Sequence, residues 1–373
     1  MNVKERKRLP AIEYMRGISM LGVIGIHIGS QYLANPSANI NLIALFEIVT
    51  RFAVPIFFFI SAFGLFYRLD LDAPFDYQKF MRRRFKTVLI PYLTWSILYL
   101  IHDGWFYNVG FPAPDYLAKI LFFGIAKYQL YFMVILLWFY ALMPLWIAIV
   151  RRITPRGLFL LLIVQIAFDY FSSYNQAFNA YVYSLPTDDL WRWFLFFRLN
   201  WLVLHYVFIF VIGGWLAVRF ERFNEFMQSN TLLISIGFVI TLTGMLAHYN
   251  YIVRVWGLTP EAAINIAHQL SPIGILYTLA ASIFFFALFS TVDFGAFKNL
   301  LSILGRHSYF AYLVHPLVIT YLMWWLQSTG RLLTAATAIG FYIATVAISL
   351  TMAALSATIG NIFPLINKLT IGK

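Results

Sequence analysis

The chain has 373 residues, of which 61% are hydrophobic and only 11% are charged, and its mean hydropathy is +0.76. This composition excludes a soluble globular domain and is typical of a membrane protein with many spans. Cysteine is absent, which excludes disulfides, thiolate catalysis and cysteine metal sites, and no metal is expected. The net charge of +12 does not indicate a nucleic-acid partner, because the basic residues cluster in short loops.

Hydropathy predicts ten membrane-spanning helices. They cover residues 11–33, 40–67, 84–101, 128–150, 158–172, 198–219, 231–249, 271–292, 308–326 and 332–359. Most lysines and arginines fall in one alternate set of loops, so the positive-inside rule places both termini in the cytoplasm. We therefore expect an all-α integral membrane bundle that forms one transmembrane domain over residues 1–373, with no separate soluble domain.

The first predicted helix carries ionisable residues inside an apolar run. Arg16 and His27 are eleven positions apart, which is close to three turns, so both side chains project from one face and lie roughly 16 Å apart along it. Charges inside a membrane rarely lack a partner or a task, so this face predicts a polar passage, with Arg16 near the cytoplasm and His27 in the outer half. His27 as a hydrogen-bonded packing residue is the alternative. Gly25 and Gly29 form a small-xxx-small pair that predicts close approach of a neighbouring helix.

The second predicted helix holds Glu47 and Arg51, spaced i, i+4 at a depth comparable to that of His27. The two side chains can pair with each other, and either could reach His27, where a carboxylate would orient the imidazole. A purely structural pair is an equally good interpretation. Pro55 should kink this helix.

A dense basic run leads into the third predicted helix. It consists of Arg82, Arg83, Arg84 and Lys86. Such a run can be a topological anchor that attracts anionic lipid. Because it continues into a span on the same side as Arg16, it also predicts a site for a phosphate-bearing cytoplasmic ligand, such as a nucleotide-containing cofactor.

Candidate residues for binding an outside ligand lie in and around the segment 173–197. Tyr174 and Trp191 suit stacking on sugar faces, although an interfacial aromatic belt is the more ordinary explanation. Asp169 and His205 flank the segment and are predicted to line the outer mouth. His315, directly before Pro316 in a later span, is either a second lining residue or a hydrogen-bonded partner at a helix kink.

With these residues in place, the chain resembles the acyltransferase-3 family of integral membrane O-acyltransferases. Four motifs carry the match in the family's order: EYMRG at 13–17 with His27, RFAVPIFFFIS at 51–61, the basic run leading into PYLTWS at 91–96, and LGRHSYFAYLVHP at 304–316. The chain departs from the family pattern in Glu13 for aspartate, Ala62 for glycine, Lys86 for arginine and Tyr131 for tryptophan.

The resemblance implies a bacterial cytoplasmic membrane enzyme that moves an acetyl or succinyl group from cytoplasmic acyl-CoA to a hydroxyl of a cell-surface glycan. The basic run would hold the CoA phosphates, with Arg16 nearer the thioester arm. His27 would be the general base or would itself be acylated, and Arg51 or a tyrosine would stabilise the oxyanion.

Within the family, the chain is similar to the intercellular-adhesion, exopolysaccharide-modifying branch. Members of that branch are assigned either to exporting poly-N-acetylglucosamine or to O-succinylating it. A polysaccharide exporter or flippase of the same architecture is therefore the alternative function. The expected partners are the lipid bilayer, acyl-CoA and a glycan, and the sequence gives no indication of oligomeric state.

Overall fold

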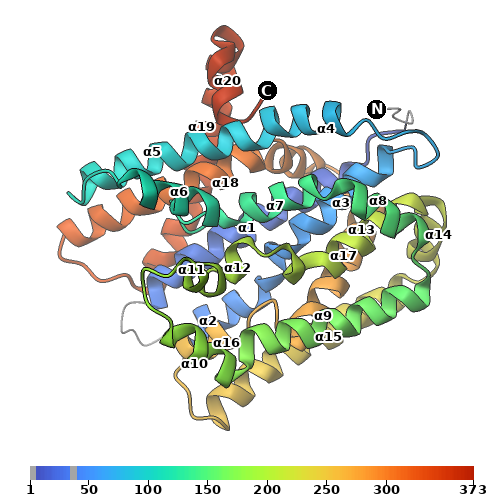
Figure 1. Cartoon of the computed structure of the whole chain (residues 1–373), viewed down its shortest axis with the longest axis horizontal. Helices are drawn as coiled ribbons and strands as arrows, with labels where there is room; N and C mark the ends of the chain where they lie inside the picture. Colours follow the sequence, from blue (N-terminus) through green and yellow to red (C-terminus); the bar gives the residue numbers. More distant parts are fainter. Residues whose placement is uncertain (1–5, 34–39) are drawn as a thin grey trace. The chain divides into compact units, whose positions relative to one another are not determined.

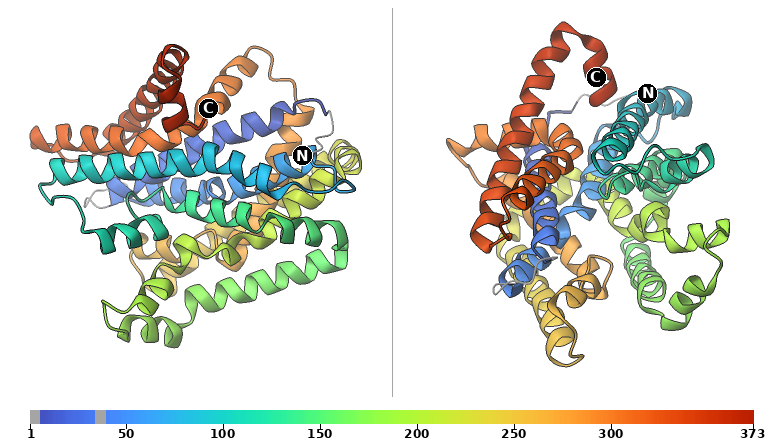
Figure 2. Two further views of the ribbon diagram at one scale, coloured as in Figure 1. Left: turned by 45° about the horizontal axis from the view of Figure 1, so that its top comes forward. Right: turned by 90° about the vertical axis from the view of Figure 1, so that its left-hand side faces the viewer.

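The structure is a computed structural model that describes residues 6–33 and 40–373. Within this described part, the regular elements are all helices and none is a strand (Figure 1). The two further views in Figure 2 show the same helices joined by short loops. The all-α prediction is therefore confirmed for the described residues.

Seven of the described helical segments are long and apolar enough to cross a membrane, and nine qualify if two bent helix pairs each count as one span. The bends measure 67° within Tyr131–Arg152 and 95° within Val203–Ser229. The third predicted span, at 84–101, is not among these nine. It falls on the π-helical segment Phe85–Leu89 and on α5 (Ile90–Phe106), which has 17 residues. Ten spans and cytoplasmic termini stay predictions.

The chain divides into two compact units, which we describe separately. Among the described residues, the α1 unit comprises those from Arg6 to Arg68 together with Phe208–Ala353, and the α5 unit comprises Leu69–Val207 and Ala354–Lys373.

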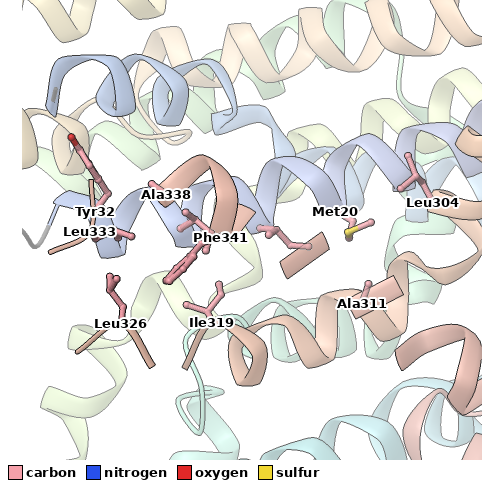
Figure 3. Close-up of a cluster of buried hydrophobic side chains, with 11 residues drawn as sticks. Met20, Tyr32, Leu304, Ala311, Ile319, Leu326, Leu333, Ala338 and Phe341 are labelled. Atoms are coloured by element: carbon pink, nitrogen blue, oxygen red, sulfur yellow. The ribbon is translucent and has the colours of Figure 1, made fainter. Parts of the chain in front are cut away.

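The α1 unit contains helices from both halves of the chain. They are α1 (Pro10–Leu33), α2 (Ile40–Val49), η1 (Arg51–Ala53), α3 (Pro55–Arg68), α13 (Val207–Val218), α14 (Phe220–Ser229), α15 (Thr231–Arg254), α16 (Pro260–Ile266), α17 (Pro272–Thr291), α18 (Phe297–Ser328) and most of α19 (Ala335–Ile362). A buried apolar cluster joins α1, α18 and α19, and Figure 3 shows Met20, Ala311, Ile319 and Phe341 among its members.

The second predicted span is interrupted. One helix was expected over 40–67, whereas α2 ends at Val49, a 3₁₀ turn covers Arg51–Ala53, and α3 begins at Pro55. Proline lacks an N–H and suits the first turn of a helix, so one α-helix ends before Pro55 and a new one begins there. The interruption lies where the kink was predicted, and Leu42–Arg68 is still long and apolar enough to be one span.

Glycines on one side of α1, among them Gly22 and Gly29, pack against this interrupted span. A methyl group built on Gly22 would lie 2.8 Å from the Ala53 side chain, and one on Gly29 would lie 2.6 Å from a Glu47 carboxylate oxygen. Glycine therefore permits the close helix approach that the small-xxx-small pair predicted.

The α5 unit has its own set of helices. They are α4 (Tyr77–Arg84), η2 (Phe85–Leu89), α5 (Ile90–Phe106), α6 (Pro114–Phe123), α7 (Tyr131–Ala141), α8 (Met143–Arg152), α9 (Pro155–Tyr174), α10 (Gln176–Ser184), α11 (Leu190–Phe196), α12 (Arg198–Trp201), η3 (Val203–Tyr206), the end of α19 and α20 (Pro364–Thr370). The Trp95 indole on α5 donates to the Thr370 carbonyl of α20 at 3.1 Å.

Candidate active site

Arg16 and His27 lie on one uninterrupted helix, α1. The absence of a break means that the eleven-residue step keeps both side chains on one face, as predicted. Arg16 is exposed and His27 is half-buried. Arg16 and His27 therefore lie on the same face of α1, about three turns apart, as the sequence predicts.

His27 packs against the second histidine that the sequence analysis singled out. The His27 and His315 ring centroids lie 5.3 Å apart with an angle of 18° between the ring planes, so the two imidazoles are stacked. His315 is completely buried in α18, and its Nδ1 lies 3.3 Å from the Ala311 carbonyl oxygen. A carbonyl only accepts hydrogen bonds, so we assign the proton of His315 to Nδ1 and a lone pair to Nε2.

Glu47 and Arg51 form the predicted i, i+4 pair across the end of α2. Nη2 of Arg51 lies 3.4 Å from Oε2 of Glu47 and also donates to the Ile264 carbonyl at 3.0 Å. The side chains are only 3% and 13% exposed for Glu47 and Arg51, respectively. Charges this deeply buried are costly unless paired and hydrogen-bonded, and both conditions hold here.

Glu47 and His315 meet α1 on different sides. Glu47 lies against Gly29, whereas His315 lies against His27. Two residues along a helix correspond to a rotation of about 200°. The structure therefore brings His27 together with His315 and Glu47 together with Arg51, and it leaves Arg51 close enough to His27 to act on it electrostatically.

The basic run belongs to the α5 unit and divides into two kinds of side chain. Arg82, Arg83 and Lys86 are exposed. The Arg84 guanidinium instead lies over the rings of Phe80 and Tyr140, 5.0 and 4.8 Å from their centroids. Of the four predicted phosphate ligands, the structure thus presents three to solvent and packs Arg84 on aromatic faces.

Asp169 and His205 form a buried pair within the α5 unit. Oδ1 of Asp169 lies 2.5 Å from Nδ1 of His205, and both side chains are fully buried. Gln165 donates through Nε2 to Oδ2 of Asp169 and to the Leu204 carbonyl, both at 2.8 Å. The sequence analysis missed Gln165, although its i, i+4 spacing to Asp169 on α9 could have indicated the contact.

The two aromatic candidates differ in exposure. Trp191 is exposed in α11. Tyr174, at the end of α9, is half-buried and packs against Tyr170 with ring centroids 5.5 Å apart. Of the two aromatic rings, that of Trp191 is therefore the more accessible to a ligand.

Comparisons with known proteins agree with the motifs. A family profile described as "Acyltransferase domain" (acyltransferase-3) matches residues 9–354. Proteins from the Staphylococcus aureus strains MRSA252, Mu50 and N315, each named "Probable poly-beta-1,6-N-acetyl-D-glucosamine export protein", are 23% identical over 279 residues, which is 73% of this chain and 70% of each relative. No solved structure matches the chain. The multi-pass helices and the match over nearly the whole length lead to one conclusion: the chain belongs to the acyltransferase-3 family of membrane acyltransferases.

Proposed function

We propose that the protein is a transmembrane O-acyltransferase. It takes an acetyl or succinyl group from acyl-CoA on the cytoplasmic side and transfers it to a hydroxyl of a polysaccharide on the outer side. The observation that carries the proposal is His27, held on an unbroken helix on the same face as Arg16 and stacked on a second histidine.

Imidazole suits the chemistry at this position. Its ordinary pKa is near neutral, so it can accept a proton from a hydroxyl and return it within one cycle. His27 therefore serves as the general base, or one of its ring nitrogens carries the acyl group. Arg16 is placed nearer the thioester arm of the donor.

The Glu47–Arg51 pair supplies a fixed positive group beside the same helix. Arg51 is anchored by Glu47 and by the Ile264 carbonyl, and a guanidinium has five N–H donors in a rigid fork. A positive group positioned in advance stabilises the oxyanion of an acyl-transfer step. Glu47 holds that group in place and compensates its charge.

The exposed residues Arg82, Arg83 and Lys86 provide a cationic surface for the phosphates of CoA. On the acceptor side, Trp191 and Tyr174 provide aromatic faces for sugar rings. Asp169 and His205 support the segment between them through their buried hydrogen bond.

The name of the relatives favours a second candidate function. They are named as export proteins for poly-beta-1,6-N-acetyl-D-glucosamine, so polysaccharide export through the same helices is the alternative. An exporter needs no donor thioester, and this requirement separates the two functions.

The test is acyl transfer by the purified protein in detergent, with labelled acetyl- or succinyl-CoA and poly-β-1,6-N-acetylglucosamine oligosaccharide. Label should reach the oligosaccharide with wild type and with His248→Ala, a control at a half-buried histidine of α15. Transfer should fall by a factor of roughly 10² or more in His27→Ala. Donor that stays intact with wild type would contradict the enzyme function and favour export.

A further inference from the structure

The imidazole rings of His27 and His315 lie next to each other. Their centroids are 5.3 Å apart, and the ring planes differ by 18°. His315 contributes Nε2 with its lone pair, because Nδ1 donates to the Ala311 carbonyl.

The packing of α1 against α18 fixes the register of the two rings. A methyl group built on Gly17 would lie 2.9 Å from the Leu304 side chain, so the helices meet closely near their cytoplasmic ends. The Ser302 hydroxyl donates to Glu13 Oε1 at 2.9 Å. Beyond this contact, Met20, Ile319 and Leu326 fill the buried interface (Figure 3). Close-packed interiors resist sliding, so the histidines keep this placement.

We infer that His315 is a second catalytic histidine, which acts as general base while His27 carries the acyl group. The inference rests on the proposed function and goes further, because it selects the two-step route. Direct transfer needs one base. An acyl group on one ring nitrogen withdraws electrons and makes the other nitrogen of the same ring a poor base. A relay through His27 therefore needs a second base beside it, and His315 supplies one.

The steps balance without a further reactant. A ring nitrogen of His27 attacks the thioester carbon, the C–S bond breaks, and the proton from the other ring nitrogen of His27 goes to the CoA thiolate. The acceptor hydroxyl then gives its proton to Nε2 of His315 while its oxygen attacks the acyl carbon. The C–N bond to His27 breaks, and the proton on His315 passes to the released imidazole, which restores both rings.

The test is a single-turnover experiment with full-length protein and labelled acyl-CoA. In His315→Gln, release of about one CoA per protein should persist, with the label retained on the protein and labile to hydroxylamine. Transfer to the oligosaccharide should fall by a factor of roughly 10²–10⁴, as expected for loss of a general base. The matched control His307→Gln, at a half-buried histidine of the same helix, should behave as wild type.

Wild type provides a second test that does not depend on the folding of a variant. Without oligosaccharide it should accumulate about one acyl group per chain, and adding oligosaccharide should discharge it. Full turnover with no acylated protein, or an equal fall of CoA release and transfer in His315→Gln, would overturn the relay and leave the proposed function standing. If wild type consumes no acyl-CoA, the proposed function itself fails.

Discussion

At the scale of single residues, the site depends on how buried charges are compensated. Glu47 and Arg51 were predicted to pair because i, i+4 neighbours meet on a helix, and that local rule holds. The His27–His315 stack could not be predicted, because it joins residues from opposite ends of the chain, and a spacing rule covers only one helix. The Ile264 carbonyl that anchors Arg51 was missed for the same reason.

The Glu47–Arg51 pair gives a test that separates structure from catalysis. Arg51→Met should lower the unfolding free energy by roughly 3–5 kcal/mol, because it leaves Glu47 buried without its counter-charge. The double variant Glu47→Met/Arg51→Met should recover most of this stability and remain inactive, as measured by thermal unfolding in detergent and by acyl transfer. Recovery of activity in the double variant would show that the pair is only structural.

The Asp169–His205 pair predicts a loss of stability. Asp169→Ala should lower the unfolding free energy by roughly 3–5 kcal/mol, because it breaks a fully buried pair and leaves His205 Nδ1 without its acceptor. Thermal unfolding measures the effect, with Asp188→Ala as the exposed control. Equal melting temperatures for the two variants would contradict a structural role of the buried pair.

At the scale of helices, apolar length alone predicted most spans, because about 20 apolar residues must cross the bilayer as a helix. Hydropathy did not locate the break between α2 and α3, because a single arginine in the short 3₁₀ turn does not end a long apolar run. Hydropathy also placed the start of the ninth span at residue 308, whereas α18 starts at Phe297. The polar residues between these two positions are part of the helix, although they lower the hydropathy. The π-helical segment Phe85–Leu89, which includes the last residue of the basic run, has no signal in hydropathy.

The close contact of α1 and α18 predicts a strong effect of one methyl group. In Gly305→Ala the new methyl would overlap the Glu13 backbone, so the helices must separate, at a cost of roughly 1–3 kcal/mol or more. Melting temperature and acyl transfer should both fall. Gly340→Ala on α19 is the matched control, because nothing lies within 4 Å of the methyl it adds. Indistinguishable melting of the two variants would show that α1 and α18 tolerate a wider spacing.

The two kinds of arginine in the last turn of α4 predict different defects. Arg83→Gln removes an exposed cation and should raise KM for acyl-CoA by a factor of about 10, with little change in melting temperature. Arg84→Gln should lower the melting temperature, because it removes a guanidinium packed on Phe80 and Tyr140. Steady-state kinetics and thermal unfolding of both variants test the division, and the reverse pattern of defects would refute it.

At the scale of the whole molecule, the proposed function depends on which side of the membrane each substrate binds. The uneven distribution of lysine and arginine among the loops predicts cytoplasmic termini and a cytoplasmic basic run. In the proposed function, acyl-CoA binds on the cytoplasmic side and the acceptor is an outer polysaccharide. The acyl group would then cross the bilayer within the protein.

The measurement that tests this claim most directly uses purified protein in liposomes, with the basic loops facing inward. Labelled acyl-CoA is enclosed in the lumen and poly-β-1,6-N-acetylglucosamine oligosaccharide is added only outside. We predict labelled oligosaccharide outside the liposomes with wild type, and a fall by a factor of roughly 10² or more with His27→Ala. Intact acyl-CoA inside, or label that appears only on oligosaccharide placed in the same compartment as the donor, would contradict transfer across the membrane.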